Sequence, residues 1–227
     1  MTPERLIRGL PKYEPVRSHA DGERSYSTPL GSCRSVTTIL SATRDNSGLE
    51  AWRDSVGHAR ADGIRNLASF RGTRHHENVE RFLLDGTEPD FNFLNTPYWN
   101  STRAFLNRVE KPLVMEGAVY HPLRYAGTFD CIAYLDDDDE QPSLLDWKTA
   151  DKERNPVKMY EYSIQVAAYV AACNYVYAAQ GLNIRRGLIV VALPDEEPQI
   201  EELSERKLTQ YFKHFEARVK RFTRARG

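Results

Sequence analysis

Hydrophobic and polar residues alternate with a helical period through much of the first half of the chain. The run Ser35–Ala42 places hydroxyl residues ahead of apolar ones, which is typical of a capped helix start. Residues 48–70 are polar overall but carry enough spaced apolar side chains for one buried helical face. Residues 71–86, with glycines near both ends, predict a separate helix of about three turns, and residues 96–111 predict another short helix.

The pattern changes at Pro112, beyond which β-branched and apolar runs predict strands. The first three strand candidates are residues 113–121, 126–135 and 143–149, with an acidic turn at 136–142. A long helix closed by Gly181 follows, and residues 185–193 form a short, apolar, buried strand candidate. The final segment predicts an amphipathic helix, because its apolar residues recur at helical spacing. These residues are Leu208, Phe212, Phe215, Val219 and Phe222.

This order of elements predicts an α/β fold with a mixed central sheet flanked by helices and preceded by an N-terminal helical part. We expect an arm over residues 1–34 that is partly flexible, a helical part over 35–111 and a core over 112–227. The 227 residues allow one substantial hydrophobic core. The three parts are therefore expected to form one globular domain.

Composition narrows the class of protein. The three cysteines are scattered without a C-x-x-C pair, which argues against a disulfide framework and a zinc ribbon. No apolar run approaches the roughly 18–20 residues needed to cross a bilayer. The net charge of −1 weighs against a simple basic nucleic-acid binder, although it leaves room for an enzyme whose positive charge is local.

The strand candidate that ends in D-W-K-T carries the most informative chemistry. Residues two apart on a strand share a face, so Asp146 and Lys148 project together while Leu145 and Trp147 project into packing. Asp130 ends the preceding strand candidate, and a hairpin-like pairing brings it beside Asp146. Two close carboxylates repel unless a cation such as Mg²⁺ or Mn²⁺ lies between them. The alternative is a surface hairpin with an ordinary Asp–Lys pair, since D-x-K alone is common.

Two helical spacings add further polar groups. Gln165 and Tyr169 stand four residues apart and share one helix face, as do His76 and Glu80. A neutral imidazole is a suitable extra ligand for Mn²⁺ or Mg²⁺, so His76 is a candidate metal ligand. His75 points about 100° away on the same helix and is expected to be solvated.

Together these motifs resemble the PD-(D/E)xK nuclease superfamily in its RecB-like exonuclease branch. The motifs are G-x-x-x-H-x-x-x-E at Gly72 to Glu80, Glu116, G-x-x-D at Gly127 to Asp130, D-W-K-T at Asp146 to Thr149, and Q-x-x-x-Y at Gln165 to Tyr169. Segments from Ser35 to Val219 also resemble the mitochondrial genome-maintenance exonucleases of this branch. The chain departs from the written motif, because no proline precedes Asp130 and an aspartate stands before Trp147.

The resemblance implies a role for each matched residue. Asp130 and Asp146 are the expected metal ligands, with His76 and the backbone carbonyl of Trp147 completing the set. Lys148 is the expected catalytic lysine. Gln165 and Tyr169 are expected to position the catalytic groups or the substrate backbone. Glu80, Glu116 and Thr149 are near-site candidates, and for Glu116 a structural role is equally open.

The resemblance also implies an activity, which is metal-dependent hydrolysis of DNA from free ends of a single strand, leaving 5′-phosphates. Mg²⁺ or Mn²⁺ is the expected cofactor, and the single strand is the expected partner of a monomer without membrane or organic cofactor. The helices before Pro112 would form a wall or arch along the strand. An endonuclease of the same superfamily and a catalytically inactive nucleic-acid-binding module remain alternatives.

Other features leave more than one interpretation open. Arg71, Arg74 and Arg81 surround His76 and are candidates for DNA contact. Two interpretations are open for Trp52, Tyr98 and Trp99. Their rings stack on nucleic-acid bases, or they pack in the core, which we favour. For the basic C-terminal segment 218–227, two roles are equally open: contact with phosphate groups, or a favourable interaction with the dipole of the helix that ends there. The N-terminus lacks an apolar signal region and makes a poor transit helix, so we expect a bacterial or phage-infected bacterial cytoplasm rather than the mitochondrial matrix.

Overall fold

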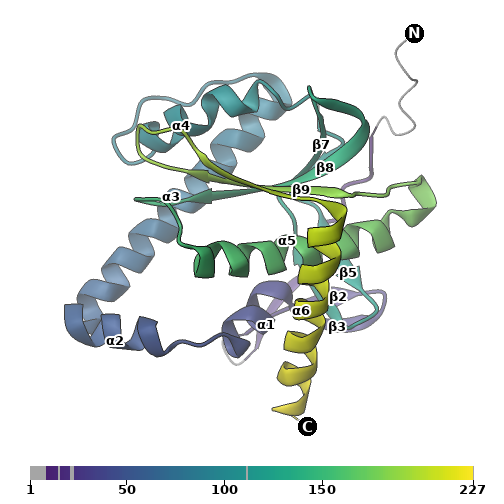
Figure 1. Cartoon of the computed structure of the whole chain (residues 1–227), viewed down its shortest axis with the longest axis horizontal. Helices are drawn as coiled ribbons and strands as arrows, with labels where there is room; N and C mark the ends of the chain where they lie inside the picture. The colour runs from purple at the N-terminus through teal and green to yellow at the C-terminus, as the bar shows by residue number, and fades with distance from the viewer. Residues whose placement is uncertain (1–8, 15, 21–22, 111, 227) are drawn as a thin grey trace.

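The fold is built on two five-stranded mixed sheets, shown in Figure 1. The computed structural model describes residues 9–14, 16–20, 23–110 and 112–226. The first sheet, called the N-terminal sheet here, contains β1 (Arg17–Ala20), β2 (Glu23–Thr28), β3 (Gly31–Ser35), β6 (Tyr125–Thr128) and β5 (Ala118–His121), in that spatial order. Its β3–β6 pair is parallel and its other pairs are antiparallel.

The second sheet, called the central sheet, carries the D-W-K-T motif. Its spatial order is β10 (Gln199–Leu203), β9 (Arg186–Ala192), β8 (Asp138–Thr149), β7 (Cys131–Leu135) and β4 (Val114–Met115). The pair β8–β9 is parallel and the other pairs are antiparallel. A mixed α/β architecture was predicted, and the structure contains it, but with two sheets where one was expected.

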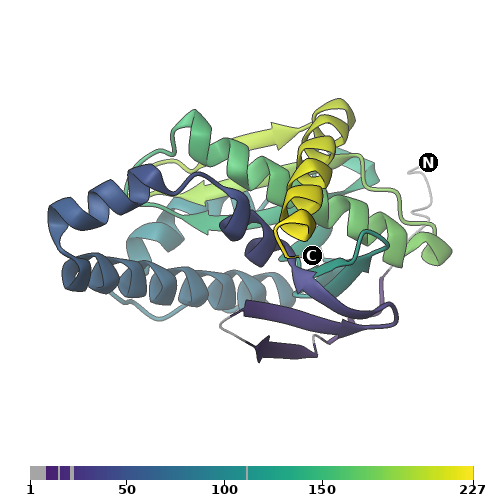
Figure 2. The ribbon, with the colours of Figure 1, turned by 90° about the horizontal axis from the view of Figure 1, so that it is seen from below.

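Helices cover both faces of the central sheet. The helices are α1 (Val36–Thr43), α2 (Ser47–Val56), α3 (His58–Asp85), α4 (Thr96–Leu106), α5 (Pro156–Val176), the short η1 (Ala178–Gln180) and α6 (Glu205–Arg224). In Figure 1, α4 lies on one side of this sheet and α5 and α6 lie on the other. Figure 2 shows α2 leading away from α1 and the long α3 returning beside it.

The alternation along β8 explains why the sheet has two buried faces. Leu145 and Trp147 pack with Val79, Phe105 and other residues of the α3–α4 side. Leu144 packs on the opposite side with residues of α5 and α6. The prediction that Asp146 and its neighbours alternate between two faces is therefore confirmed, and it places the charged residues on the α5 side.

The helix boundaries partly follow the predicted signals. Ser35 caps α1, its Oγ accepting a hydrogen bond of 2.9 Å from the backbone N–H of Thr38. Gly86 ends α3 in the left-handed conformation at φ 77°. The expected boundary near Gly72 is wrong, because α3 runs unbroken from His58; the break lies instead at Gly57, where φ is 86°. One interior glycine costs a helix only about 1 kcal/mol, which packing overcomes.

Two predicted strands are each divided between the sheets. Residues 113–121 form β4 and β5, and residues 126–135 form β6 and β7. The first division falls at Glu116, whose φ of 51° turns the chain from one sheet into the other. The strand β10 was not predicted, because its Q-I-E-E-L sequence has no continuous apolar run.

The N-terminal segment is more regular than a loose arm. Residues 17–35 form the three strands β1, β2 and β3, and the β3–β6 pairing joins them to the rest of the fold. The burial of Tyr26 and Cys33 against Ala126 gives this sheet a small core of its own. The first eight residues lie outside the described part, and the proposed division into arm, helical part and core stays a prediction.

Candidate active site

Glu116 and Asp130 are brought together by the two chain crossings between the sheets. Met115 pairs with Cys131 and Ala118 pairs with Thr128, so Glu116 stands opposite Asp130. The backbone N–H of Glu116 donates to the carbonyl of Asp130 at 2.9 Å. The carboxylates of Glu116 and Asp130 therefore lie side by side at the point where the two chain segments pass from one sheet to the other.

The carboxylate of Asp130 is fixed by the end of the β7–β8 ladder. The ladder's last pair at this end is Cys131 with Leu145, so the backbone N–H of Trp147 is available to another acceptor. This N–H donates to Oδ2 of Asp130 at 2.8 Å. The hydrogen bond holds the buried Asp130 side chain, and Oδ1 of this residue faces His76.

His76 reaches this pair of carboxylates from α3. Its Nδ1 lies 3.6 Å from Oε1 of Glu116 and 3.6 Å from Oδ1 of Asp130, and its Nε2 lies 2.9 Å from the carbonyl oxygen of Trp147. Burial opposes the imidazolium charge, but the attraction of Asp130 and Glu116 outweighs it and raises the pKa of His76 to about 9. The imidazole is therefore held as a cation between two carboxylates.

This group fits a hard divalent cation. One donor atom each from His76, Glu116 and Asp130 lies within 4.8 Å of the others. Two carboxylates and one imidazole, with the Trp147 carbonyl adjacent, are donors that Mg²⁺ and Mn²⁺ accept. Binding of such a cation would require the His76 imidazole to lose its extra proton, because a ligating imidazole must be neutral. Bound there, it would supply an activated water and Lewis-acid stabilisation of phosphate oxygens.

Asp146 and Lys148 form a buried ion pair beside this group. The Asp146 side chain has no solvent exposure, and its Oδ2 contacts Nζ of Lys148. Burial raises the pKa of Asp146 to about 6 against the effect of Lys148. Burial lowers the pKa of Lys148, but Asp146 and Asp130 outweigh it and raise this pKa above its ordinary value. The lysine is therefore an ammonium at neutral pH.

The role of Asp146 as a metal ligand stays a prediction. Among the described residues its carboxylate is outside the group formed by His76, Glu116 and Asp130, and Oδ1 of Asp146 is buried without a hydrogen-bond partner. Glu116, in contrast, belongs to the group. The sequence left the role of Glu116 open, because its position beside Asp130 depends on the chain crossings between the two sheets.

Gln165 and Tyr169 share one face of α5, as predicted from their spacing. The Nε2 of Gln165 donates to the hydroxyl of Tyr169 at 3.5 Å. The ring of Tyr169 lies against Gly127 of β6, where an added Cβ would come within 2.6 Å of its Cε1. The glycine of the G-x-x-D motif therefore makes room for the tyrosine of the Q-x-x-x-Y motif.

Tyr162 is a site residue that sequence reasoning missed. The ammonium of Lys148 lies 5.5 Å from the centre of the Tyr162 ring, a cation–π contact. The residue stands three positions before Gln165 on α5, so it lies on the same helix side. This spacing was the available signal.

Thr149 and the three arginine candidates have different surroundings. Arg71 is 7% exposed; it donates to Oγ1 of Thr149 at 3.4 Å and to Oδ1 of Asp151 at 2.6 Å. It also stacks on Tyr98, and its role in DNA contact stays a prediction. Arg74 and Arg81 are exposed on α3, and Arg74 pairs with Glu77 at 2.9 Å.

The expectation that His75 is solvated is wrong. Its side chain is 1% exposed, and neither ring nitrogen has a hydrogen-bond partner among the described residues. Burial, and then repulsion by His76, lowers the pKa of His75 to about 3. The residue is a neutral imidazole inside the α3 packing.

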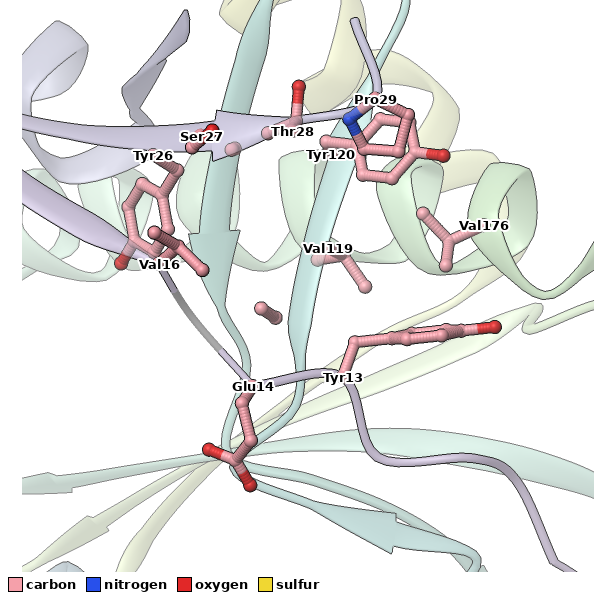
Figure 3. A pocket seen from close by; sticks show the side chains of 12 residues that line it. Tyr13, Glu14, Val16, Tyr26, Ser27, Thr28, Pro29, Val119, Tyr120 and Val176 are labelled. Atoms are coloured by element: carbon pink, nitrogen blue, oxygen red, sulfur yellow. The ribbon is translucent and has the colours of Figure 1, made fainter. Parts of the chain in front are cut away.

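One of two cavities of similar size opens on these groups. A cleft of about 400 Å³ opens on the candidate metal group and is lined by Arg17, Gly72, Thr73, His76, Glu77, Glu80 and Glu116. Glu80 therefore lies at the site, where it also pairs with Lys12 at 3.5 Å. A second cavity of about 400 Å³ lies between the segment around Tyr13 and strand β5, as Figure 3 shows. None of the candidate catalytic residues lines it.

Comparison with known proteins identifies the class. A family model of the PD-(D/E)XK nuclease superfamily matches residues 32–226, and the chain belongs to this superfamily. Membership indicates phosphodiesterase activity on a nucleic-acid substrate, typically with a divalent metal, and the His76 group agrees with it. No curated protein matched the sequence. No helix in the described part of the chain is long and apolar enough to cross a membrane.

Proposed function

We propose that this protein is an Mg²⁺- or Mn²⁺-dependent exonuclease that hydrolyses single-stranded DNA from free ends and leaves 5′-phosphates. One observation carries the proposal. The ammonium of Lys148 is held by Asp146 and lies 3.4 Å from the Trp147 carbonyl, which itself contacts His76 of the candidate metal group. A fixed cation and a cation-binding group therefore flank the same backbone carbonyl.

Each residue has a defined task in this hydrolysis. His76, Glu116 and Asp130 would hold the divalent cation, and the buried carboxylate of Asp146 fixes the position of Lys148. Because the pKa of Lys148 is raised, its ammonium is suited to stabilising charge on a phosphate rather than to accepting a proton. Gln165 donates to the Tyr169 hydroxyl, and burial together with the nearby charge of Asp146 raises the pKa of Tyr169, so both residues are suited to positioning the catalytic groups.

The choice of exonuclease over endonuclease is supported by the resemblance of the full motif set to the RecB-like branch. The preference for a single strand has the same support. The Gly72, Gly127, Gln165 and Tyr169 positions of that set have structural partners: Gly127 lies against Tyr169, and Gly72 lies near Thr149. This agreement between motif and packing favours an intact catalytic site over a degenerate binding module.

The test compares hydrolysis of a labelled linear single strand with that of the same strand closed into a circle. Each is incubated with Mg²⁺, Mn²⁺ or EDTA, using the wild type, Lys148→Ala and the surface control Lys213→Ala. We expect metal-dependent loss of the linear strand alone, abolished in Lys148→Ala and retained in Lys213→Ala. Cutting of the circle would establish an endonuclease. Absence of any cutting by folded wild type in either metal would leave a binding module.

A further inference from the structure

A basic groove runs between the α2–α3 pair and helices α5 and α6. Its cavity has a volume of about 690 Å³. Five cations and two carboxylates contribute to its lining, so the groove carries a positive excess although the chain as a whole has a net charge of −1. The cations are Arg44, Arg53, Arg65, Lys158 and Arg218, and the carboxylates are Asp45 and Glu161.

Among the described residues, three cations in or beside this groove have no carboxylate partner. Arg218 pairs with Glu161 at 2.5 Å, and Arg53 pairs with Asp62 at 3.0 Å. In the described part of the chain, no carboxylate lies within ion-pair distance of Arg44, Lys158 or the neighbouring Arg154. The Nε of Arg154 is also buried without a hydrogen-bond partner there.

Lys158 lies close to two other cations at an unfavourable position. Lys158 lies in the first turn of α5, where the helix dipole is positive. Loss of water around the ammonium, followed by repulsion from Arg44 and Arg154, lowers the pKa of Lys158, and Glu161 only partly opposes this. An uncompensated cluster of this kind is relieved by a bound anion, and phosphate groups are the anions that a nuclease substrate brings.

Helix α2 adds an exposed aromatic side chain to the groove. None of the residues of α2 is buried, although Leu49 and Trp52 are large and apolar. Trp52 is 38% exposed and lines the groove, so the favoured interpretation of this residue as core packing is wrong. Tyr98 and Trp99, by contrast, are 6% exposed and pack as core residues. A partly exposed tryptophan beside cations suits the stacking of an unpaired base.

The groove leads to the catalytic lysine along α5. Tyr162 follows Lys158 by four residues, about 6 Å along the helix axis, and its ring contacts the Lys148 ammonium. Arg154 donates to the carbonyl of Thr149 at 3.3 Å, directly after Lys148. Arg44 also lines a further cavity of about 690 Å³, next to Arg221 and Arg226 of the C-terminal segment.

We propose that this groove binds the sugar–phosphate backbone of a single-stranded DNA segment adjoining the scissile phosphate. Arg44, Arg154 and Lys158 contact consecutive phosphates, and Trp52 stacks an unpaired base. The proposal rests on the proposed function for the location of the scissile phosphate. It extends that function by assigning the substrate-holding residues, none of which belongs to the catalytic motifs.

The experiment measures, by fluorescence anisotropy, the affinity of the protein for a labelled oligo-dT of about 20 nucleotides, in EDTA and over a series of salt concentrations. The variants are Lys158→Ala, Arg44→Ala and Trp52→Ala, with the exposed Lys213→Ala as the matched control, since Lys213 lines neither basic cavity. For each cation variant we expect about tenfold weaker binding and a salt slope reduced by about 0.7. Trp52→Ala should weaken binding about fivefold to a hundredfold.

Charge-conserving variants exclude a folding explanation. Lys158→Arg and Arg44→Lys should restore most of the binding. If these residues had only a structural role, affinity would not depend on whether the substituted side chain keeps its charge. Affinity and salt slope equal to those of Lys213→Ala in all three variants would overturn the proposal. Tighter binding of a blunt duplex with the same residue dependence would overturn its single-strand part.

Activity is measured separately, so that the two proposals can fail independently. If the wild type binds oligo-dT through these residues but hydrolyses nothing in Mg²⁺ or Mn²⁺, the groove stands and the exonuclease proposal fails. If the linear strand is hydrolysed equally by the wild type and the groove variants, with unchanged affinity, the groove proposal alone fails.

Discussion

Lys148 and Asp146 form an ion pair across one face of β8, and the carboxylate of this pair has no solvent exposure. Removing two charges from water is costly, and their mutual attraction compensates only while both partners are present. The pair therefore fixes the ammonium that we propose as catalytic, and the stability of the folded state depends on both partners being present.

This dependence predicts an asymmetric double-mutant cycle. Lys148→Met leaves a buried carboxylate without its cation and should lower the free energy of unfolding by about 3–5 kcal/mol at pH 8. Adding Asp146→Asn should recover most of this loss, while activity stays absent. The measurement is urea unfolding of the four proteins of the cycle. Additive losses from the two substitutions would contradict a buried pair.

The same cycle has a pH dependence with a defined sign. The pKa of Asp146 is already raised to about 6 by burial, despite the opposing effect of Lys148. Without Lys148 it rises further, so the folded state of Lys148→Met binds a proton that the unfolded state releases above about pH 4. Lys148→Met should therefore lose stability, relative to the wild type, as the pH is raised from 5 to 8. An equal stability loss at both pH values would contradict this assignment.

Metal binding should depend on the group containing His76, Glu116 and Asp130. At a Mn²⁺ concentration of about a hundred times Kd, the linked stabilisation is about 2.7 kcal/mol, or roughly 5–10 °C in Tm. His76→Ala, Asp130→Asn and Glu116→Gln should abolish most of this shift. Glu80→Gln is the matched control, because Glu80 lines the same cleft outside the group. A full shift in Glu116→Gln would remove Glu116 from the ligand set.

The local arrangement of β8 could be predicted from sequence because strand alternation depends only on neighbouring residues. The apolar Leu145 and Trp147 fix one face, which places Asp146 and Lys148 on the other. The Ser35 cap and the Gln165–Tyr169 contact were accessible for the same reason. In each case a short spacing determines which side chains meet.

The meeting of Glu116 with Asp130 could not be predicted in this way. It requires two apparently continuous strands to break at opposite positions and exchange sheets, and the turn at Glu116 has a positive φ without being a glycine. The burial of Arg71 and His75 could not be predicted from the sequence either, since arginine and histidine are usually not fully buried. Their environment depends on how α3 packs against β8 and α4, which no local pattern records.

Gly127 should be irreplaceable because of the Tyr169 ring. An added Cβ would lie 2.6 Å from Cε1 of Tyr169, so Gly127→Ala should cost about 1–3 kcal/mol of stability and lower activity by displacing the tyrosine. Gly63→Ala is the matched control, since nothing lies within 4 Å of an added Cβ there, and it should stabilise α3 by up to about 1 kcal/mol. Chemical unfolding and single-strand hydrolysis measure both effects. A Gly127→Ala variant with wild-type stability would contradict the close approach.

His75 should set part of the acid sensitivity of the fold. Its pKa is lowered to about 3 by burial, whereas an unfolded histidine titrates near 6.5. As the pH falls below about 6.5, the unfolded state gains a proton that the folded state refuses, so stability decreases by roughly 1.4 kcal/mol per pH unit from this residue. His75→Leu should remove that contribution and, by deleting two unpartnered buried nitrogens, raise stability at pH 7 by about 1–3 kcal/mol.

The measurement is urea unfolding of the wild type and His75→Leu between pH 7 and 4.5. His58→Leu is the control for the loss of an exposed imidazole, because the His58 side chain is 68% exposed. The difference in stability between His75→Leu and the wild type should widen as the pH falls. A constant difference across this range would show that His75 is protonated equally in both states, and therefore that it is not enclosed in the α3 packing.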